Sequence, residues 1–426
     1  MKKNIVLTAL IAAFVFAALP SCQLDEVTLQ CPVVTSINKT RAAAGEEVVV
    51  SVENLLLKNA GSYELRVGDR PIAIRSLDTV NQRVVFAVPQ GMKAGRVSLR
   101  LKQFSCDSTG SAMAGPYLEY ILKADQVKSS VFAGSLWQGD YVNGQGTNAR
   151  FNAPGGLAVD TITGSIFIAD LNNYRVRLAD TLGNVSVFAG NGVRSCMANS
   201  ANKFNSSFKN PGWLSYSHSS KNLYLSDRQC NMLYEISTGT NEFVGGGDND
   251  GGGCFGNGTV QLSAPEGVAV SGSEELYCVD SGAGIIRRSE QGTTCNITMP
   301  STAYQPFSLA LDEANGLLYF SDFNTGDIYR MSTENLQPEK LVFTSGSATI
   351  GNPAGLAVGP DGKLFIADAT EGKVLQYYRQ SGILEELSLP FASDLVEPWG
   401  LAYDHKRGKL YLSDRQLHVL FVICLS

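Results

Sequence analysis

The sequence lacks several features that would point to common functional classes. It has no cluster of lysine or arginine able to follow a phosphate backbone, and its net charge is −6, so nucleic acid is not an expected partner. Runs with helical periodicity are scarce, whereas glycine is abundant at 43 residues, which favours β-strands joined by tight turns. Hydrophobic residues make up 44% of the chain, which indicates well-packed domains rather than disorder.

The chain begins with two lysines, an apolar stretch and a small residue before Cys22. This order predicts a secretory signal peptide over residues 1–22, too short and too early to be a membrane span. The stretch LPSC resembles a bacterial lipobox, which implies that Cys22 becomes the lipidated first residue; the alternative is a plain signal peptide with a chance cysteine. The following QLDE resembles the export tag of Bacteroidetes surface lipoproteins, so residues 23–30 are interpreted as tag and tether.

There are nine cysteines, and setting Cys22 aside leaves eight, which permits disulfides in an exported chain. Cys31 and Cys106 lie in the first predicted domain and could form one bridge. Cys278 stands in the apolar run LYCVD and is predicted to be a buried free thiol. Pairing stays open among the five others, Cys196, Cys230, Cys254, Cys295 and Cys424, although the first three fall in loops on one face and could supply one pair.

Residues 31–124 contain short runs in which apolar residues alternate with polar ones, among them EEVVVSVENL, YELRVGD and GRVSLRLK. A period of two with turn residues between the runs predicts a small β-sandwich of the immunoglobulin type. The opening PVVTSINKTRAAAGEEVVVSVENL and the later VPQG resemble an IPT/TIG domain. Such domains are commonly stalks in exported proteins, and a spacer role is the expectation here.

Six later segments share a proline, a small residue, two apolar runs separated by a turn, and a closing aspartate. The first is PGGLAVDTITGSIFIAD and the last is PWGLAYDHKRGKLYLSD. Their closing aspartates recur at intervals of roughly 40–60 residues, which is typical of propeller blades of four antiparallel strands. These aspartates are Asp170, Asp227, Asp280, Asp322, Asp368 and Asp414, and each is expected to accept backbone hydrogen bonds within turns.

The run IADLNNYRVR after the first segment resembles the NHL signature, and the resemblance covers residues 126–426. It implies that residues 125–426 form a six-bladed NHL-type β-propeller. The sixth repeat reaches Ser426 after three strands, whereas the pentapeptide SVFAG occurs at Ser130–Gly134 before any repeat and again at Ser186–Gly190. The early copy is therefore expected to pair with the last blade and close the ring.

One rim of this propeller should carry the connections between blades together with the turns between the second and third strands. Three of the connections between blades are long (135–153, 191–210 and 248–264), which indicates either a binding lip or tolerated insertions. Aromatic side chains at the mouth suit stacking on sugars or capture of apolar side chains, although propellers also place large residues near the axis for packing. The binding candidates on this rim are Trp137, Tyr174, Trp213, Arg228, Glu266, Phe307, Trp399 and Arg415.

Several enzymes resemble this fold, including metal-dependent lactonases and amidating lyases, and they need converging carboxylates or histidines. His218 and His405 fall in turns of the far rim and His418 on a strand of the last blade, so they cannot share one ion. There is no GxSxG nucleophile motif. The stretch DNDGGGCFGNG has two aspartates of a calcium loop, Asp248 and Asp250, but lacks the distal glutamate. The sequence therefore predicts no metal, no cofactor and no enzyme.

The two resemblances together match accessory lipoproteins that accompany SusC/SusD-type uptake systems of Bacteroidetes. They imply an outer-membrane, cell-surface protein that is attached to the membrane through its lipid alone. The first hypothesis is that the rim binds a glycan or peptide for a SusC/SusD-type transporter. The alternatives are a non-catalytic scaffold that docks on an outer-membrane complex and, less favoured, a propeller hydrolase or lyase.

Overall fold

The structure is a computed structural model, which describes the chain in eleven segments. These are residues 5–6, 28–29, 32–53 with 55, 60–92, 94–101, 117–120, 127–196, 202–237 with 241–246, 262–290 with 293–297, 305–344, and 348–389 with 395–425. Most of the predicted signal peptide, the export tag and Cys22 lie outside these residues, as do Cys31 and Cys106.

The described residues are almost entirely β-strands and turns, which confirms the all-β prediction. The chain divides into two compact units, Met1–Leu122 and Lys123–Ser426. No helix in the described part of the chain is long and apolar enough to cross a membrane. Its short 3₁₀ turns are η1 (Ala60–Ser62), η3 (Gly146–Asn148), η4 (Leu171–Asn173), η5 (Lys203–Asn205), η6 (Glu313–Asn315) and η7 (Pro360–Gly362).

The first unit contains a sandwich of two sheets, with strand orders β4-β11-β10-β6-β7 and β3-β5-β9-β8. The alternation read from the sequence determines which face is buried: Val48, Val50 and Val52 of β5 point inward and pack with Leu65 of β6. The strands are β3 (Val33–Ile37), β4 (Arg41–Ala42), β5 (Glu47–Glu53), β6 (Tyr63–Val67), β7 (Arg70–Ile72), β8 (Ser76–Asp78), β9 (Arg83–Ala87), β10 (Gly95–Leu101) and β11 (Tyr117–Tyr120); β1 (Ile5–Val6) pairs separately with β2 (Thr28–Leu29).

The second unit contains six sheets among its described residues; five are built from strands that follow one another along the chain, and the sixth adds β12 (Val127–Gly134) to the last three strands. They are β14 (Pro154–Asp160), β15 (Ser165–Asp170), β16 (Arg175–Ala179), β17 (Asn184–Ala189) and β13 (Gly144–Gln145); β18 (Pro211–Tyr216), β19 (Leu223–Asp227), β20 (Met232–Ile236) and β21 (Asn241–Gly246); β22 (Pro265–Val270), β23 (Leu276–Asp280), β24 (Ile285–Glu290) and β25 (Thr293–Ile297); β26 (Pro306–Asp312), β27 (Leu317–Asp322), β28 (Asp327–Ser332) and β29 (Glu339–Lys340); β30 (Pro353–Val358), β31 (Leu364–Asp368), β32 (Lys373–Tyr378) and β33 (Ile383–Glu386); and β34 (Pro398–Asp404), β35 (Lys409–Asp414) and β36 (Val419–Leu425) with β12 (Val127–Gly134).

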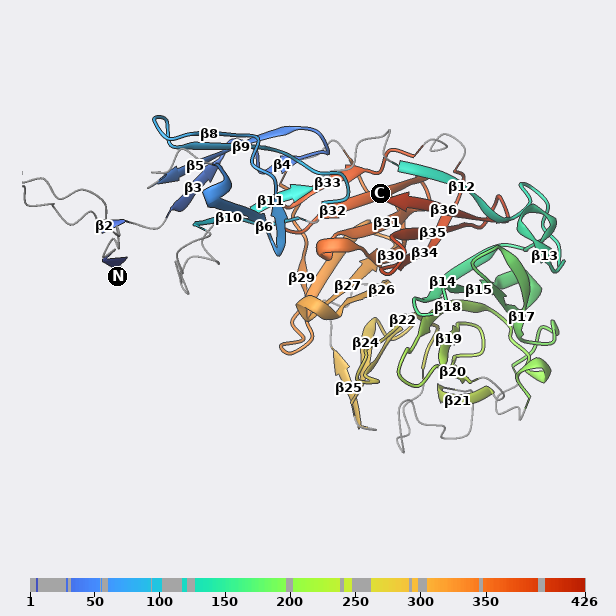
Figure 1. The fold of residues 1–426 in the computed structure, drawn as a ribbon. Helices are drawn as coiled ribbons and strands as arrows, with labels where there is room; N and C mark the ends of the chain where they lie inside the picture. Colours follow the sequence, from blue (N-terminus) through green and yellow to red (C-terminus); the bar gives the residue numbers. More distant parts are fainter. Residues whose placement is uncertain are drawn as a thin grey trace, which may run out of the picture. The chain divides into compact units, whose positions relative to one another are not determined.

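The first strand of each sheet contacts the first strand of the next, from β14 through β18, β22, β26 and β30 to β34, and β34 contacts β14 again. Figure 1 shows these six inner strands gathered around a common centre. The arrangement is a closed ring of sheets consistent with a β-propeller. Each sheet is too narrow to bury its two faces alone, so the apolar residues of neighbouring sheets form the cores between them.

The ring is closed by β12, which precedes all the other strands of this unit and pairs with β36 at the end of the chain. The antiparallel register runs from Val127 opposite Leu425 to Gly134 opposite Val419. The pairing expected for the early SVFAG copy is therefore present. It covers a strand whose Leu420 and Ile423 are fully buried.

The inner strands approach one another so closely that glycine is needed near their starts. A Cβ atom on Gly156 would lie 2.6 Å from the carbonyl oxygen of Gly212, and one on Gly267 would lie 2.7 Å from the backbone nitrogen of Leu309. The same Cβ on Gly156 would lie 3.1 Å from a ring carbon of Trp213. Glycine in one sheet therefore leaves the space that a tryptophan of the next sheet occupies.

The closing aspartates connect each sheet to the segment that leads into it, as the sequence predicts. Asp368 is representative, because its carboxylate accepts hydrogen bonds from the backbone N–H groups of Gly351, Asn352 and Glu371. The other five aspartates likewise accept from backbone N–H groups just before their own inner strands. These bonds position the entry to each inner strand, where the side chains described next originate.

The cysteines follow the expectations wherever the structure describes them. Cys196 and Cys230 form a disulfide, which is one of the pairs considered among the loop cysteines. Cys278 is buried and free, as predicted, and Cys424 is free and half-buried. Cys254 and the calcium-like stretch with Asp248 and Asp250 lie outside the described residues.

Candidate functional site

A cavity of about 490 Å³ lies where the inner strands begin. Two repeated positions supply most of its wall: the residue after each opening proline and the residue after each closing aspartate. Because both positions recur once per sheet, the ring brings them together at one end. The lining residues are Gly155, Leu171, Asn210, Pro211, Gly212, Trp213, Arg228, Gln229, Glu266, Ser281, Gln305, Phe307, Phe323, Asn324, Trp399 and Arg415.

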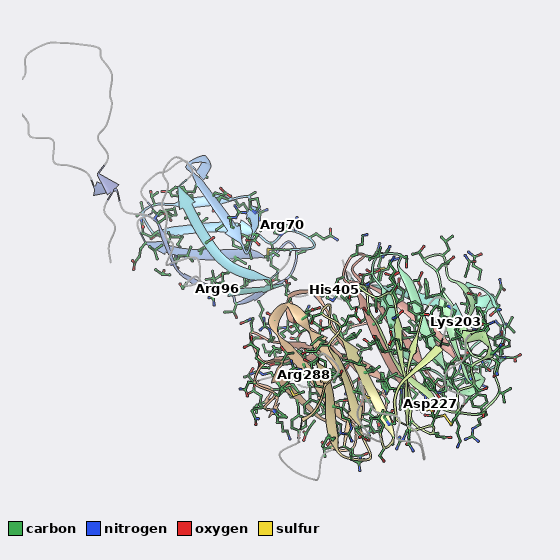
Figure 2. The ribbon with its side chains drawn as sticks, turned by 90° about the horizontal axis from the view of Figure 1, so that it is seen from below. Arg70, Arg96, Lys203, Asp227, Arg288 and His405 are labelled. Carbon is green, nitrogen blue, oxygen red and sulfur yellow. A yellow bond between two sulfur atoms is a disulfide. The ribbon has the colours of Figure 1, made fainter. Side chains whose placement is uncertain are left out.

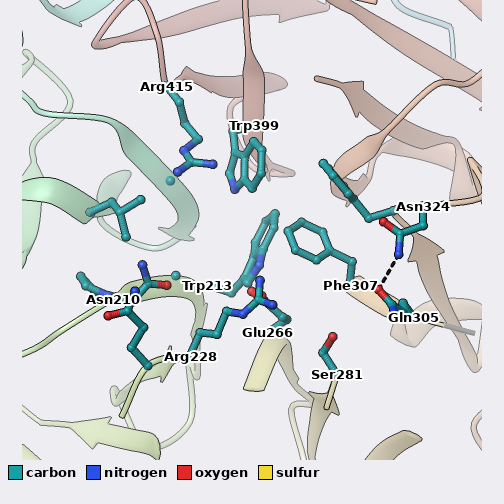
Figure 3. A pocket seen from close by; sticks show the side chains of 16 residues that line it. Asn210, Trp213, Arg228, Glu266, Ser281, Gln305, Phe307, Asn324, Trp399 and Arg415 are labelled. Atoms are coloured by element: carbon teal, nitrogen blue, oxygen red, sulfur yellow. Dashed lines mark hydrogen bonds and ion pairs between the residues drawn. The ribbon is translucent and has the colours of Figure 1, made fainter. Parts of the chain in front are cut away.

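Four aromatic rings, here called the aromatic floor, line this cavity, and Figure 3 labels three of them, Trp213, Phe307 and Trp399. The rings of Trp213 and Trp399 are nearly parallel, with centroids 6.5 Å apart, and Phe307 meets each of them edge-on at 5.6 Å. Phe323 contacts Phe307 at 4.7 Å. Trp213 and Phe307 are only 7% and 8% exposed, whereas Trp399 and Phe323 are half-buried. The solvent-facing aromatic surface is therefore provided by Trp399 and Phe323.

Glu266 is the one acidic residue among those that line the cavity, and it is 5% exposed. Its carboxylate lies 2.9 Å from Nη1 of Arg228 and accepts a hydrogen bond from the indole N–H of Trp213. Burial raises its pKa to about 7, and the charge of Arg228, the Trp213 bond and the charge of Arg415 oppose this rise only in part. Such a carboxyl group can hold or release a proton near neutral pH.

Two arginines reach the aromatic floor from different sides (Figure 3). The Arg228 side chain is 53% exposed, with one nitrogen engaged by Glu266. The Arg415 guanidinium lies 4.0 Å from the centroid of the Trp399 ring, a cation–π contact, and 3.7 Å from the carboxylate of Glu397. Burial lowers the pKa of Arg415. The cavity thus combines an aromatic face, two cations and one buried acid.

The structure brings together six of the eight predicted rim residues: Trp213, Arg228, Glu266, Phe307, Trp399 and Arg415 all line the cavity. Trp137 does not line it, is 63% exposed, and donates its backbone N–H to Leu417. Tyr174 is half-buried in the turn before β16 and also lies apart from the lining. A ligand-binding role for Trp137 and Tyr174 stays a hypothesis, and neither residue lines this cavity.

Sequence reasoning missed the polar side chains at the edge of the cavity and Phe323. A usable signal was present, because Phe323 directly follows a closing aspartate, as Arg228 and Arg415 do. The missed polar residues either follow a closing aspartate within two positions or precede an opening proline; they are Asn210, Gln229, Ser281, Gln305 and Asn324. Among them, Asn324 donates a side-chain hydrogen bond to Gln305.

The three histidines do not lie in the cavity lining. His218 stands in the turn after β18 and His405, which is labelled in Figure 2, in the turn after β34, as expected. His418 was expected on a strand but lies in the turn before β36. Its φ of 60° is left-handed and does not fit a strand, and its Nδ1 accepts a hydrogen bond from the backbone N–H of Ala153. In the described part of the chain, no three His, Cys, Asp or Glu side chains gather as a metal site would require.

The raised pKa of Glu266 predicts a pH-dependent stability. The folded state binds more protons than the unfolded state between the ordinary pKa of 4.5 and the folded pKa of about 7, so raising the pH through this range removes stability. We expect the free energy of unfolding, relative to Glu266→Gln, to fall by about 2–3 kcal/mol between pH 5 and pH 8. Chemical denaturation at a series of pH values measures it.

The matched control is Glu274→Gln on the opposite rim. Burial is the largest single influence on the Glu274 carboxyl group and raises its pKa. Hydrogen bonds from three serine hydroxyls together outweigh burial and hold the pKa of Glu274 below its ordinary value. The stability that ionised Glu274 contributes is lost only as the pH falls through that lowered pKa. The difference in the free energy of unfolding between the unmodified protein and Glu274→Gln should therefore be constant from pH 5 to pH 8. A difference for Glu266→Gln that is equally constant contradicts the prediction.

Comparisons with known proteins identify the fold. No family model matches the chain. A curated relative, Protein SUPPRESSOR OF QUENCHING 1, chloroplastic, from Arabidopsis thaliana, is 23% identical over 254 residues, which are 56% of this chain and 20% of that protein. The chain thus spans about a fifth of the length of the curated relative it matches.

Similar solved structures include two that cover nearly the whole chain. One is an auxiliary nutrient binding protein from Bacteroides thetaiotaomicron VPI-5482, with TM-score 0.54 and 14% identity, covering 92% of this chain and 97% of that one. The other is an auxiliary nutrient binding protein from Bacteroides ovatus ATCC 8483, with TM-score 0.53, 12% identity and the same coverage. At these identities the likeness establishes the fold.

A gluconolactonase from Xanthomonas campestris is also similar, with TM-score 0.50 and 14% identity over 65% of this chain and 87% of that one. The prediction that this chain is not an enzyme is therefore wrong as an inference from its architecture. The same arrangement of sheets supports catalysis elsewhere, and function depends on side chains at the site rather than on the fold. A missing nucleophile motif does not exclude chemistry at Glu266.

Proposed function

We propose that this chain is a cell-surface nutrient-binding lipoprotein that accepts its ligand, a glycan or a peptide, in the cavity of the ring and passes it to a SusC/SusD-type transporter. In this proposal residues 1–22 are removed, Cys22 carries the lipid, and residues 23–30 form the export tag and tether. Residues 31–124 are an IPT/TIG stalk, and residues 125–426 are a six-bladed NHL-type propeller that presents the cavity.

One observation carries the proposal: the cavity combines a solvent-facing aromatic surface with a ring of polar side chains. Trp399 and Phe323 offer the flat apolar face, and the edge carries hydrogen-bonding amides such as Gln229 and Asn324. Binding sites for small ligands are typically apolar hollows with a few convergent polar groups. The two Bacteroides structures described as auxiliary nutrient binding proteins support the same role, since they share the fold over nearly their whole length.

The test is a calorimetric titration of the purified protein with neutral oligosaccharides, acidic oligosaccharides and peptides. We expect one class to bind saturably and Trp399→Ala to weaken that binding at least about tenfold, because the ring supplies the stacking surface. Trp137→Ala is the matched control: it removes an equally large ring that is exposed and outside the cavity, and it should leave the affinity unchanged.

Two results would count against the proposal. Binding that survives in Trp399→Ala but is lost in Trp137→Ala would move the site out of the cavity. Absence of binding to all three ligand classes would favour the docking alternative. That alternative predicts that the tagged protein co-purifies with an outer-membrane complex. Thermal unfolding of each variant by circular dichroism separates a loss of binding from a loss of fold.

A further inference from the structure

The charge of the cavity is opposite to that of the chain. The whole sequence carries −6, but the charged residues lining the cavity are two arginines, Arg228 and Arg415, and the single acid Glu266. With Glu266 ionised the cavity keeps one net positive charge, and with Glu266 protonated it carries two. A local cationic site on an acidic protein attracts an anionic group selectively, because the surrounding surface repels anions elsewhere.

Arg228 is placed to contact a ligand. More than half of its side chain is exposed at the cavity, and the bond to Glu266 engages Nη1. A guanidinium carries five N–H donors in a planar fork, which leaves donors in position for a second carboxylate. The pair with Glu266 also orients the arginine, so little side-chain freedom remains to be lost on binding.

Arg415 is a cation whose partners in the structure are weak. Its distance of 3.7 Å from Glu397 is longer than a hydrogen bond, and its buried Nε has no hydrogen-bond partner among the described residues. Its guanidinium rests on Trp399, and both residues line the cavity. An anion bound beside it would offset the desolvation that lowers its pKa.

Glu266 lies 2.9 Å from Arg228, and Arg415 lines the same cavity and acts on the Glu266 carboxyl through its charge. A carboxylate from a ligand near the same position would meet the same two cations. Asparagine, glutamine and serine side chains line the same cavity and can bond hydroxyl groups. The aromatic surface left open is small because Trp213 and Phe307 are buried, so it suits one face of a sugar ring better than a bulky apolar side chain.

We propose that the cavity binds the carboxylate of a uronate unit in an acidic glycan, with Arg228 and Arg415 as its ligands and Trp399 stacked on the sugar ring. This inference rests on the proposed nutrient-binding function and specifies its substrate class. It assigns recognition of the ligand charge to Arg228 and Arg415, which each follow a closing aspartate. It assigns stacking on the sugar ring to Trp399, which follows an opening proline.

The experiment is calorimetry of the purified protein with oligomers of galacturonate, glucuronate and mannuronate, each also as its methyl ester. The ester keeps the ring and its hydroxyls but removes the charge. We expect at least one acid to bind about tenfold or more tighter than its ester, and this preference to disappear in Arg228→Gln and in Arg415→Gln. Lys406→Gln is the matched control, since it removes one exposed positive charge in the turn after β34 and should keep the preference.

The outcomes separate this inference from the function on which it rests. Equal binding of acid and ester, or of a neutral oligosaccharide, that is lost in Trp399→Ala overturns the uronate assignment and leaves nutrient binding in place. Arginine-dependent binding of acetyl-glycyl-phenylalanine but not of its amide, with no response to the uronates, overturns the assignment to a sugar. Silence with every probe contradicts both proposals.

Discussion

A chain that begins at Ser135, and therefore lacks β12, is expected not to fold into a soluble monomer. Removing β12 would expose the whole edge of β36, a run of apolar residues in which Leu420, Phe421 and Ile423 are buried in the intact protein. An unpaired apolar edge both frays and associates with other chains. The remaining sheets would also form an open array instead of a ring.

The matched chain begins at Lys123, keeps β12 and corresponds to the second compact unit. Size-exclusion chromatography should give a monomer for this chain and aggregates for the shorter one. A synthetic peptide with the β12 sequence Val127–Gly134, added during refolding, should restore part of the monomer by pairing with β36. A monomeric shorter chain with an unchanged melting temperature would show that ring closure contributes little.

Replacing Arg177 by leucine is expected to lower the free energy of unfolding by about 3–5 kcal/mol, because it leaves a buried carboxylate without its cation. Arg177 and Asp170 are both fully buried, with Nη1 2.8 Å from Oδ2. The same guanidinium donates to the carbonyl oxygens of Arg150 and Val142 and to the side chain of Asn143, so it also holds the segment before β14.

A comparison within the ring explains why this arginine is needed. Leu375 occupies the equivalent position of another sheet, where Asp368 already accepts three backbone N–H groups. Asp170 accepts one backbone N–H and one side-chain amide besides the arginine. Burial raises the pKa of Asp170, and the charge of Arg177 lowers it. The loss of unfolding free energy in Arg177→Leu should therefore shrink at acidic pH, where the Asp170 carboxyl becomes protonated.

Denaturant unfolding followed by tryptophan fluorescence measures this effect in the second unit, which contains all three tryptophans. Arg175→Leu is the control: it removes an arginine two residues away that donates to two backbone carbonyls, and we expect a loss below about 1.5 kcal/mol. The double variant Asp170→Asn with Arg177→Leu should recover part of the stability. Equal effects for the two arginines would refute the argument.

Local patterns were sufficient for the fold because each element carries its own signal. Period-two alternation located β5, β6, β9 and β10, and the repeated proline and aspartate located the inner strands and the strands beside them. Even the pairing of β12 with β36 could be predicted, since a strand was missing at one end and a copy was present at the other. The exception was His418, placed on a strand although its backbone adopts a left-handed turn.

The site was predicted in part for the same reason. Glu266, Phe307 and Trp399 directly follow an opening proline and Trp213 stands two residues after one, and a ring brings such positions to one end. Phe323 and the amides were missed because the residue type at their repeat positions varies from sheet to sheet. The enzyme prediction was wrong because it treated missing motifs as evidence, whereas a related architecture supports a lactonase.

The sequence by itself determined the all-β class, the succession of sheets and the identity of six cavity residues, because strand periodicity and repeat spacing are local properties of the chain. Only the tertiary structure decided that Trp137 lies apart from the cavity, that Arg228 pairs with Glu266, and that Arg415 rests on Trp399. The first of these two contacts joins neighbouring sheets, and the second joins the turn after β35 to the start of β34 within one sheet. Their distances, burial and the raised pKa of Glu266 arise only when the ring closes and excludes water from its mouth.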